Sequence, residues 1–206
     1  MQMILDTILP RKERVVRIDR YSLDDIPVSP QEHETCGVSI TTLMQYRHRA
    51  VEDLIRALKY DKSGHAAKLL ADALAEYLCE EIANLKAFST KPVVLIPVPL
   101  HSSRIRERGF NQVEKVLQNL PREFKDGTIS SIESKLLVRT RATPQQTRLS
   151  RSERLRNVAD AFALAKAPEN THIILIDDVT TTGATLSQAA KPFSKLSLTL
   201  LALAHA

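Results

Sequence analysis

The sequence has no tryptophan, two cysteines, five glycines and only 4% aromatic residues, and these shortages narrow the class of protein. Cys36 and Cys79 cannot build a disulfide framework or a four-cysteine zinc site, so we expect no zinc and a reducing, cytoplasmic location. No apolar run approaches the roughly 20 residues that a membrane-spanning helix needs, so no membrane span is expected. The first residues also lack the basic-then-apolar order of a secretory signal.

The composition is that of an ordinary globular protein. Of the 206 residues, 43% are hydrophobic and 26% are charged, which is enough apolar material to bury a core. The formal net charge is +5, and the segment 101–157 holds 13 basic against 6 acidic side chains, so the positive excess falls there. Because the arginine fork suits phosphate oxygens, this segment indicates either a polyphosphate or nucleic-acid ligand or simply a solvated basic surface.

Short apolar runs alternate with segments of helical periodicity along most of the chain. Strands are expected at 38–44, 93–99, 173–176 and 196–203. Helices are expected at 48–59, 66–85, 111–120 and 185–193. This order predicts an α/β fold with a mostly parallel sheet flanked by helices over residues 46–206, preceded by a strand-containing appendage over residues 1–45.

One predicted strand ends in two adjacent carboxylates, Asp177 and Asp178, directly before a threonine-rich turn and a helix start. Ligands of open α/β sheets bind beyond the carboxyl ends of strands, and a helix N-terminus favours phosphate. Gly183 removes the Cβ that would keep the backbone away from such a group. The acids would repel phosphate, so we expect them to face ribose hydroxyls or a metal. A helix-capping cluster is the alternative, but it does not explain both acids together with the whole hydroxyl run.

The run from residue 173 to 185, four aliphatics followed by Asp-Asp-Val and Thr-Thr-Thr-Gly-Ala-Thr, resembles the phosphoribosyl-diphosphate (PRPP) loop of type I phosphoribosyltransferases. Further segments are similar to the ComF/GntX-like members of that superfamily. They are Leu-Lys-Tyr at 58–60, Pro-Val-Pro-Leu-His at 97–101, Arg-Gly-Phe-Asn-Gln at 108–112 and Arg-Thr-Arg at 139–141. The resemblance covers about residue 46 to the C-terminus and implies the type I phosphoribosyltransferase fold.

The resemblance also implies a role for each matched residue. Asp177 and Asp178 would be the catalytic pair, contacting the ribose hydroxyls directly or through Mg²⁺ that PRPP itself holds, with no metal site made by the protein alone. The 5′-phosphate would be bound by the turn made of Thr180, Thr181, Thr182, Gly183, Ala184 and Thr185. The diphosphate would face Leu100, His101, Arg104 and Arg108. Arg141 would begin a basic loop, 141–157, that closes over the site.

The implied reaction is Mg²⁺-assisted transfer of phosphoribosyl from PRPP to a nitrogenous acceptor, with release of diphosphate. No segment specifies that acceptor, and Tyr60 and Phe110 could each stack on a base or pack in the core. Relatives of this kind commonly begin with paired Cys-x-x-Cys motifs, whereas Cys36 stands alone here. Residues 1–45 are therefore either a replacement appendage or a piece that packs on a second subunit of a homodimer.

A second class of function stays open. The same fold could serve as a non-enzymatic binding or regulatory protein of natural competence, in contact with single-stranded DNA or with a protein of the DNA-uptake machinery. Platforms for single-stranded nucleic acid interleave aromatic with basic residues, yet the segment 101–157 contains only Phe110 and Phe124. That scarcity favours the small-molecule function.

Overall fold

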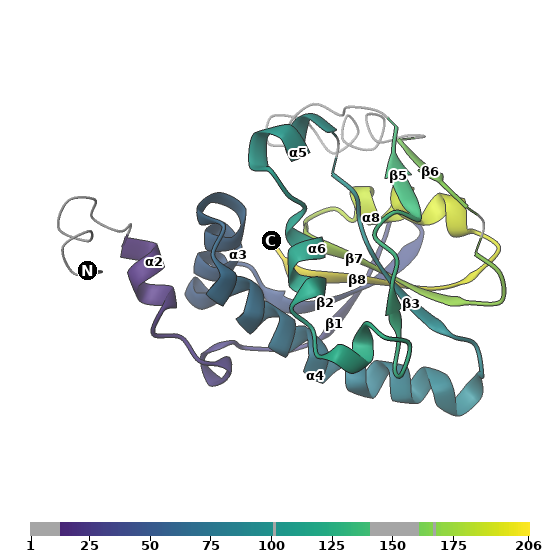
Figure 1. The fold of residues 1–206 in the computed structure, drawn as a ribbon, viewed down its shortest axis with the longest axis horizontal. Coiled ribbons are helices and arrows are strands. Elements are labelled where there is room, and N and C mark those ends of the chain that lie inside the picture. The colour runs from purple at the N-terminus through teal and green to yellow at the C-terminus, as the bar shows by residue number, and fades with distance from the viewer. Residues whose placement is uncertain (1–12, 101, 141–160, 167) are drawn as a thin grey trace.

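The computed structural model describes residues 13–100, 102–140, 161–166 and 168–206 (Figure 1). Its main sheet has six strands in the order β1-β2-β8-β7-β3-β4. The strands are β1 (Gln31–Thr35), β2 (Val38–Gln45), β3 (Val93–Pro97), β4 (Ser131–Ile132), β7 (His172–Thr180) and β8 (Ser197–His205). β1 pairs antiparallel with β2, and all the other pairs in this sheet are parallel. The predicted α/β class with a mostly parallel sheet is confirmed.

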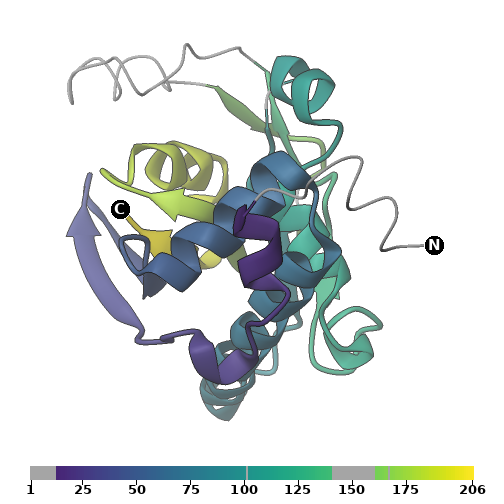
Figure 2. The same ribbon diagram turned by 90° about the vertical axis from the view of Figure 1, so that its left-hand side faces the viewer.

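Helices cover both faces of the sheet (Figures 1 and 2). The described helices are α2 (Glu13–Ile18), α3 (Arg49–Asp61), α4 (Gly64–Phe88), α5 (Ser102–Arg108), α6 (Gln112–Gln118) and α8 (Ala184–Ala190), with short 3₁₀ turns η1 (Leu23–Asp25), η2 (Arg122–Phe124) and η4 (Lys191–Phe193). A second, two-stranded sheet pairs β5 (Leu137–Arg139) with β6 (Phe162–Leu164). None of the described helices is both long and apolar enough to cross a membrane.

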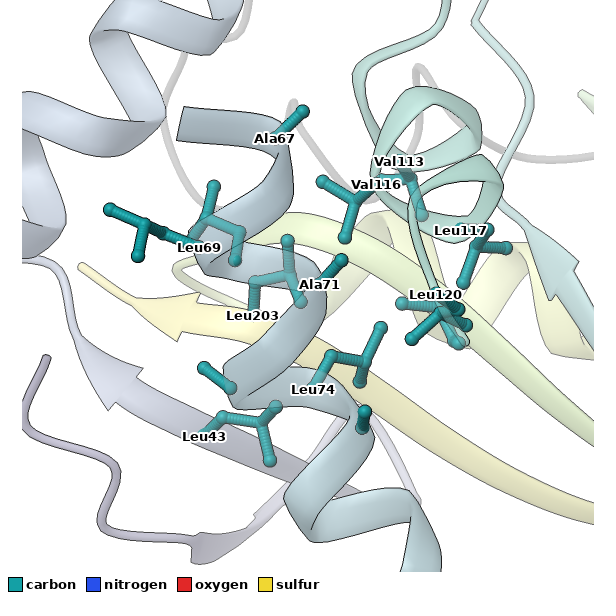
Figure 3. Close-up of a cluster of buried hydrophobic side chains, with 14 of the residues drawn as sticks. Leu43, Ala67, Leu69, Ala71, Leu74, Val113, Val116, Leu117, Leu120 and Leu203 are labelled. Carbon is teal, nitrogen blue, oxygen red and sulfur yellow. The ribbon is translucent and has the colours of Figure 1, made fainter. Parts of the chain in front are cut away.

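Alternating side chains of the central strand β7 divide the core into two layers. Ile174 and Ile176 pack on the side of α3, α4 and α6, and Ile173 and Leu175 pack on the side of α8. Figure 3 shows the first layer, where Leu74 of α4 lies over the sheet near Leu203 of β8. A strand buried on both faces needs apolar residues at every position, which is why a continuous run predicts it.

Most element boundaries differ from the sequence prediction by up to three residues, and the end of β7 differs most. The apolar strand expected at 173–176, with the two acids at its end, continues to Thr180, so Asp177 and Asp178 lie inside β7 rather than at its end. The reason is the partner strand, because β8 continues alongside and pairs Asp177 with Ala202 and Thr180 with His205.

Part of the predicted appendage lies in the main sheet. β1 and β2 come from residues 1–45, and β2 pairs in parallel with β8 over residues 41 to 45. A division of the chain at residue 45 stays a prediction. Further upstream, Arg17 of α2 donates two hydrogen bonds of 2.9 Å to the buried Asp53 of α3, which ties α2 to that helix.

Replacing Leu74 by alanine should lower the free energy of unfolding by about 2–5 kcal/mol, because the side chain is 0% exposed and a cavity would remain. Urea denaturation measures the loss. Phe88→Ala is the control, since Phe88 is 95% exposed at the end of the same helix and should change stability by less than about 0.5 kcal/mol. Equal losses in the two variants would contradict the placement of α4.

Candidate functional site

The two adjacent acids occupy the carboxyl-terminal part of β7, and both are half-buried. The backbone N–H of Asp178 donates to Oδ1 of Asp177 at 2.8 Å, and the N–H of Val179 donates to Oδ1 of Asp178 at 2.6 Å. Successive residues of a strand point to opposite faces. Asp178 therefore projects toward the α3 layer, and Asp177 toward the layer of α8 and the β5–β6 pair.

Each acid interacts with a positively charged side chain, and the two cations come from different layers. Nζ of Lys59, in the last turn of α3, lies 2.8 Å from Oδ2 of Asp178, and the two side chains are only 17% and 16% exposed. On the other side, the positive charge of Arg139 in β5 acts on Asp177, and its guanidinium lies 5.2 Å from the centre of the Phe162 ring. Arg104 of α5 is close enough to act on Arg139 in turn.

Burial raises the pKa of Asp177 to about 7, and the charge of Asp178 acts in the same direction. The hydrogen bond from the Asp178 N–H and the charges of Lys59 and Arg139 oppose this rise. Burial also lowers the pKa of Arg139, and Arg104 lowers it further, while Asp177 raises it. The site thus contains one carboxyl that exchanges a proton near neutral pH and one that is held in an ion pair.

A tight turn follows β7 and leads into α8. The N–H of Gly183 donates to Oγ1 of Thr180 at 3.2 Å, and Gly183 has φ 70°, a left-handed conformation that suits glycine. A Cβ at this position would lie 2.3 Å from Cγ2 of Thr35 and 2.8 Å from Cδ1 of Ile40. Glycine is therefore required here by the approach of the β1–β2 hairpin, a neighbour that the sequence did not reveal.

The remaining predicted site residues fall at the same edge of the sheet or outside the described residues. Thr181 is exposed, Thr182 and Thr185 are half-buried, and Ala184 is buried at the start of α8. Leu100 follows β3 and is half-buried, as are Arg104 and Arg108 on α5. His101, Arg141 and the predicted closing loop 141–157 lie outside the residues that the structure describes.

Sequence reasoning missed Lys59 and Arg139 as site residues. Both lie in segments that resemble the family, 58–60 and 139–141, and this was the signal that could have identified them. Of the two aromatic side chains considered for a base, Tyr60 is 61% exposed and so does not pack in the core. Phe110 is half-buried, and Nζ of Lys115 lies 5.2 Å from its ring centre.

Known proteins resemble this chain over most of its length, although no family model matches it. It is 33% identical over 140 residues to a protein named DNA utilization protein YhgH of Escherichia coli K12, covering 67% of this chain and 58% of that protein. It is 32% identical over 148 residues to Competence protein F of Haemophilus influenzae, covering 70% of this chain and 62% of that protein. It is 30% identical over 158 residues to Competence protein ComFC of Streptococcus pneumoniae, covering 77% of this chain and 63% of that protein.

The chain is related to the ComF proteins. This supports the ComF part of the resemblance that the sequence motifs indicated. The matches span about three fifths of the relatives' own lengths, between 58% and 63%. What those proteins do therefore bears on this chain only as a proposal.

The raised pKa of Asp177 predicts a specific dependence of stability on pH. The pKa of an unfolded aspartate is about 3.9, so the stabilisation from the protonated side chain is complete below about pH 4 and is lost as pH rises through 7. Asp177→Asn, which stays neutral, should gain stability over the wild type as pH rises from about 4 to about 7, by at most about 1.4 kcal/mol per pH unit, and the difference should level off above pH 7. Urea unfolding at each pH measures this difference.

All other ionisable groups are common to both proteins, so their contributions cancel in the comparison. Asp72→Asn, at an exposed helix ion pair, should follow the wild-type pH profile. Parallel profiles for wild type and Asp177→Asn would show that this carboxyl ionises normally.

Proposed function

We propose that this chain is a PRPP-binding protein with the type I phosphoribosyltransferase fold, which transfers phosphoribosyl to a nitrogenous acceptor with the assistance of Mg²⁺. One observation carries the proposal. Two acids at the carboxyl end of a parallel strand, each facing a cation from a different layer, lead directly into a threonine-rich turn whose left-handed glycine begins a helix. A sugar with vicinal hydroxyls and a phosphate at one end complements this order of groups.

The acids and the turn have separate tasks in this proposal. Asp178, held by Lys59, accepts hydrogen bonds from a ribose hydroxyl, and Asp177 exchanges a proton near neutral pH and so can accept or donate one. The backbone amides and hydroxyls from Thr181 to Thr185 bind the 5′-phosphate, which the partial positive charge of the helix start favours.

At the anomeric carbon, the acceptor nitrogen forms a bond while the bond to the diphosphate oxygen breaks and its electron pair leaves with diphosphate. Arg104 and Arg139 supply positive charge on that side, which offsets the charge that develops on the leaving group. This preorganised charge would lower the barrier without any movement of the arginines.

The residues fit Mg²⁺ only as a companion of the substrate. The two carboxylates project to opposite faces of β7, and Oδ2 of Asp178 is paired with Lys59. Among the described residues, no group of three or more His, Cys, Asp or Glu side chains could hold a metal ion. An ion held mainly by diphosphate and ribose oxygens, as Mg²⁺ commonly is at phosphate sites, would neutralise leaving-group charge.

Calorimetric titration tests the proposal. The wild type should bind PRPP saturably in the presence of Mg²⁺, and Asp177→Asn/Asp178→Asn should weaken binding at least about tenfold, because two hydrogen-bonded carboxylates are lost. Asp24→Asn/Asp25→Asn is a matched control that removes the same pair of charges from η1 and should bind like the wild type. A folded wild type that does not bind PRPP would overturn the proposal.

The names of the relatives favour a second candidate, a binding or regulatory protein of DNA uptake that contacts single-stranded DNA or a competence-machinery protein. The exposed Arg106 of α5 belongs to the basic segment that would contact the phosphate backbone. If so, a shift assay with a single-stranded oligonucleotide should show affinity that falls steeply with salt, and Asp177→Asn/Asp178→Asn should leave that affinity unchanged or higher. Affinity insensitive to salt, or no shift at low salt, would overturn the DNA-binding form of this candidate.

A further inference from the structure

The turn between β1 and β2 contacts the turn after β7, although about 147 residues separate them in the chain. Oγ1 of Thr35 donates a hydrogen bond to the carbonyl of Thr182 at 2.9 Å, and Sγ of Cys36 donates to the same carbonyl at 3.3 Å. In return, Oγ of Ser187 in α8 donates to the carbonyl of Cys36 at 3.4 Å. Three bonds thus join the hairpin to the turn after β7 and to the α8 helix that follows it.

The backbone of the hairpin turn is unusual for the residues that form it. Cys36 has φ 53° and Gly37 has φ 75°, the two positive values of the tightest hairpin turn. Asparagine, aspartate or glycine normally fills the first position, because a side chain with a Cβ is disfavoured there. Cysteine in this conformation directs its thiol to the turn after β7 and its carbonyl to Ser187 of α8.

The contact fixes one peptide group from both sides. The carbonyl of Thr182 and the N–H of Gly183 belong to the same planar unit, so orienting one orients the other. The hairpin holds the carbonyl, and Oγ1 of Thr180 accepts from the N–H at 3.2 Å. Cγ2 of Thr35 also occupies the space beside Gly183 that a Cβ would need.

The hairpin and the turn do not pack against each other over their whole length. Thr180, Thr181 and Gly183 border a cavity of about 180 Å³ that His33 and His205 also line. Ile40 of β2 lines the same cavity, which therefore lies between the hairpin and the turn. Packing contacts between the two are lost over its volume, so the hydrogen bonds from the hairpin matter more for the position of the turn.

We propose that Thr35, assisted by Cys36, is a positioning residue that sets the orientation of the 182–183 peptide and thereby of the amides that bind the 5′-phosphate. This inference rests on the proposed function. It makes the hairpin a determinant of affinity for the sugar-phosphate end of the substrate and not for the diphosphate end, which Arg104 and Arg139 face.

Calorimetry with two probes on the full chain separates these ends. Thr35→Val keeps the shape of the side chain and removes the donor, so ribose 5-phosphate should bind about three- to tenfold more weakly, while inorganic diphosphate with Mg²⁺ stays within about twofold of wild type. Thr35→Val/Cys36→Ala should weaken ribose 5-phosphate further, since the thiol is the second, weaker donor.

Two variants serve as controls. Thr35→Ser keeps the hydroxyl and should restore wild-type affinity. Thr199→Val makes the same exchange on β8, where it removes a hydroxyl bonded to His172, and should leave both affinities unchanged. Equal weakening of both probes by Thr35→Val, or no weakening of either, would overturn the inference.

Amide hydrogen exchange of residues 180–186 in the ligand-free protein gives a second readout that needs no ligand. Exchange should be faster in Thr35→Val than in the wild type or Thr199→Val. Unchanged exchange would refute the positioning role whatever the affinities show. A wild type that binds neither probe but shows the faster exchange in Thr35→Val would overturn the proposed function and leave the support of the turn by Thr35 intact.

Discussion

Successive side chains of a β-strand point to opposite faces, and the structure around β7 depends on this alternation. Along the first part of the strand, apolar side chains pack alternately against the α3–α4–α6 layer on one face of the sheet and against the α8 layer on the other. At its carboxyl end the same alternation sends Asp178 to one layer and Asp177 to the other. The arrangement that buries the core therefore also separates the two acids and gives each a different cation.

The two acids of the site differ in how closely a positive charge approaches them. Lys59 makes a direct contact with Asp178, which places a positive charge next to that acid. Within the part of the chain that the structure describes, the positive charge of Arg139 acts on Asp177 from its own side, and burial outweighs it. Because desolvation penalises a charge whatever its sign, it raises the pKa of the acid and lowers the pKa of the arginine. A polar ligand that contacts Asp177 and Arg139 would therefore stabilise the charged forms of both side chains.

The strands and helices of the core could be predicted from the sequence because their signals are local, such as the unbroken apolar run in β7 and the helical spacing in α4. The extension of β7 through the acids could not, since it depends on β8 continuing alongside it. The acids and the threonine turn were found by their order in the chain. Lys59 and Thr35 were missed because their partners, Asp178 and Thr182, are brought to them only by the tertiary fold.

The pairing of β2 with β8 has a practical consequence for anyone who shortens this protein. A chain that begins at residue 46, where the resemblance to the family starts, would lack β2 and would expose the backbone of β8. β8 is an apolar strand whose side chains are buried from Leu200 to Ala204. Unprotected edges of that kind recruit strands from other molecules and lead to aggregation. An expression fragment should therefore begin upstream of β1, so that the sheet ends on the polar strand Gln31–Thr35, whose glutamates and histidine make a poor template for further strands.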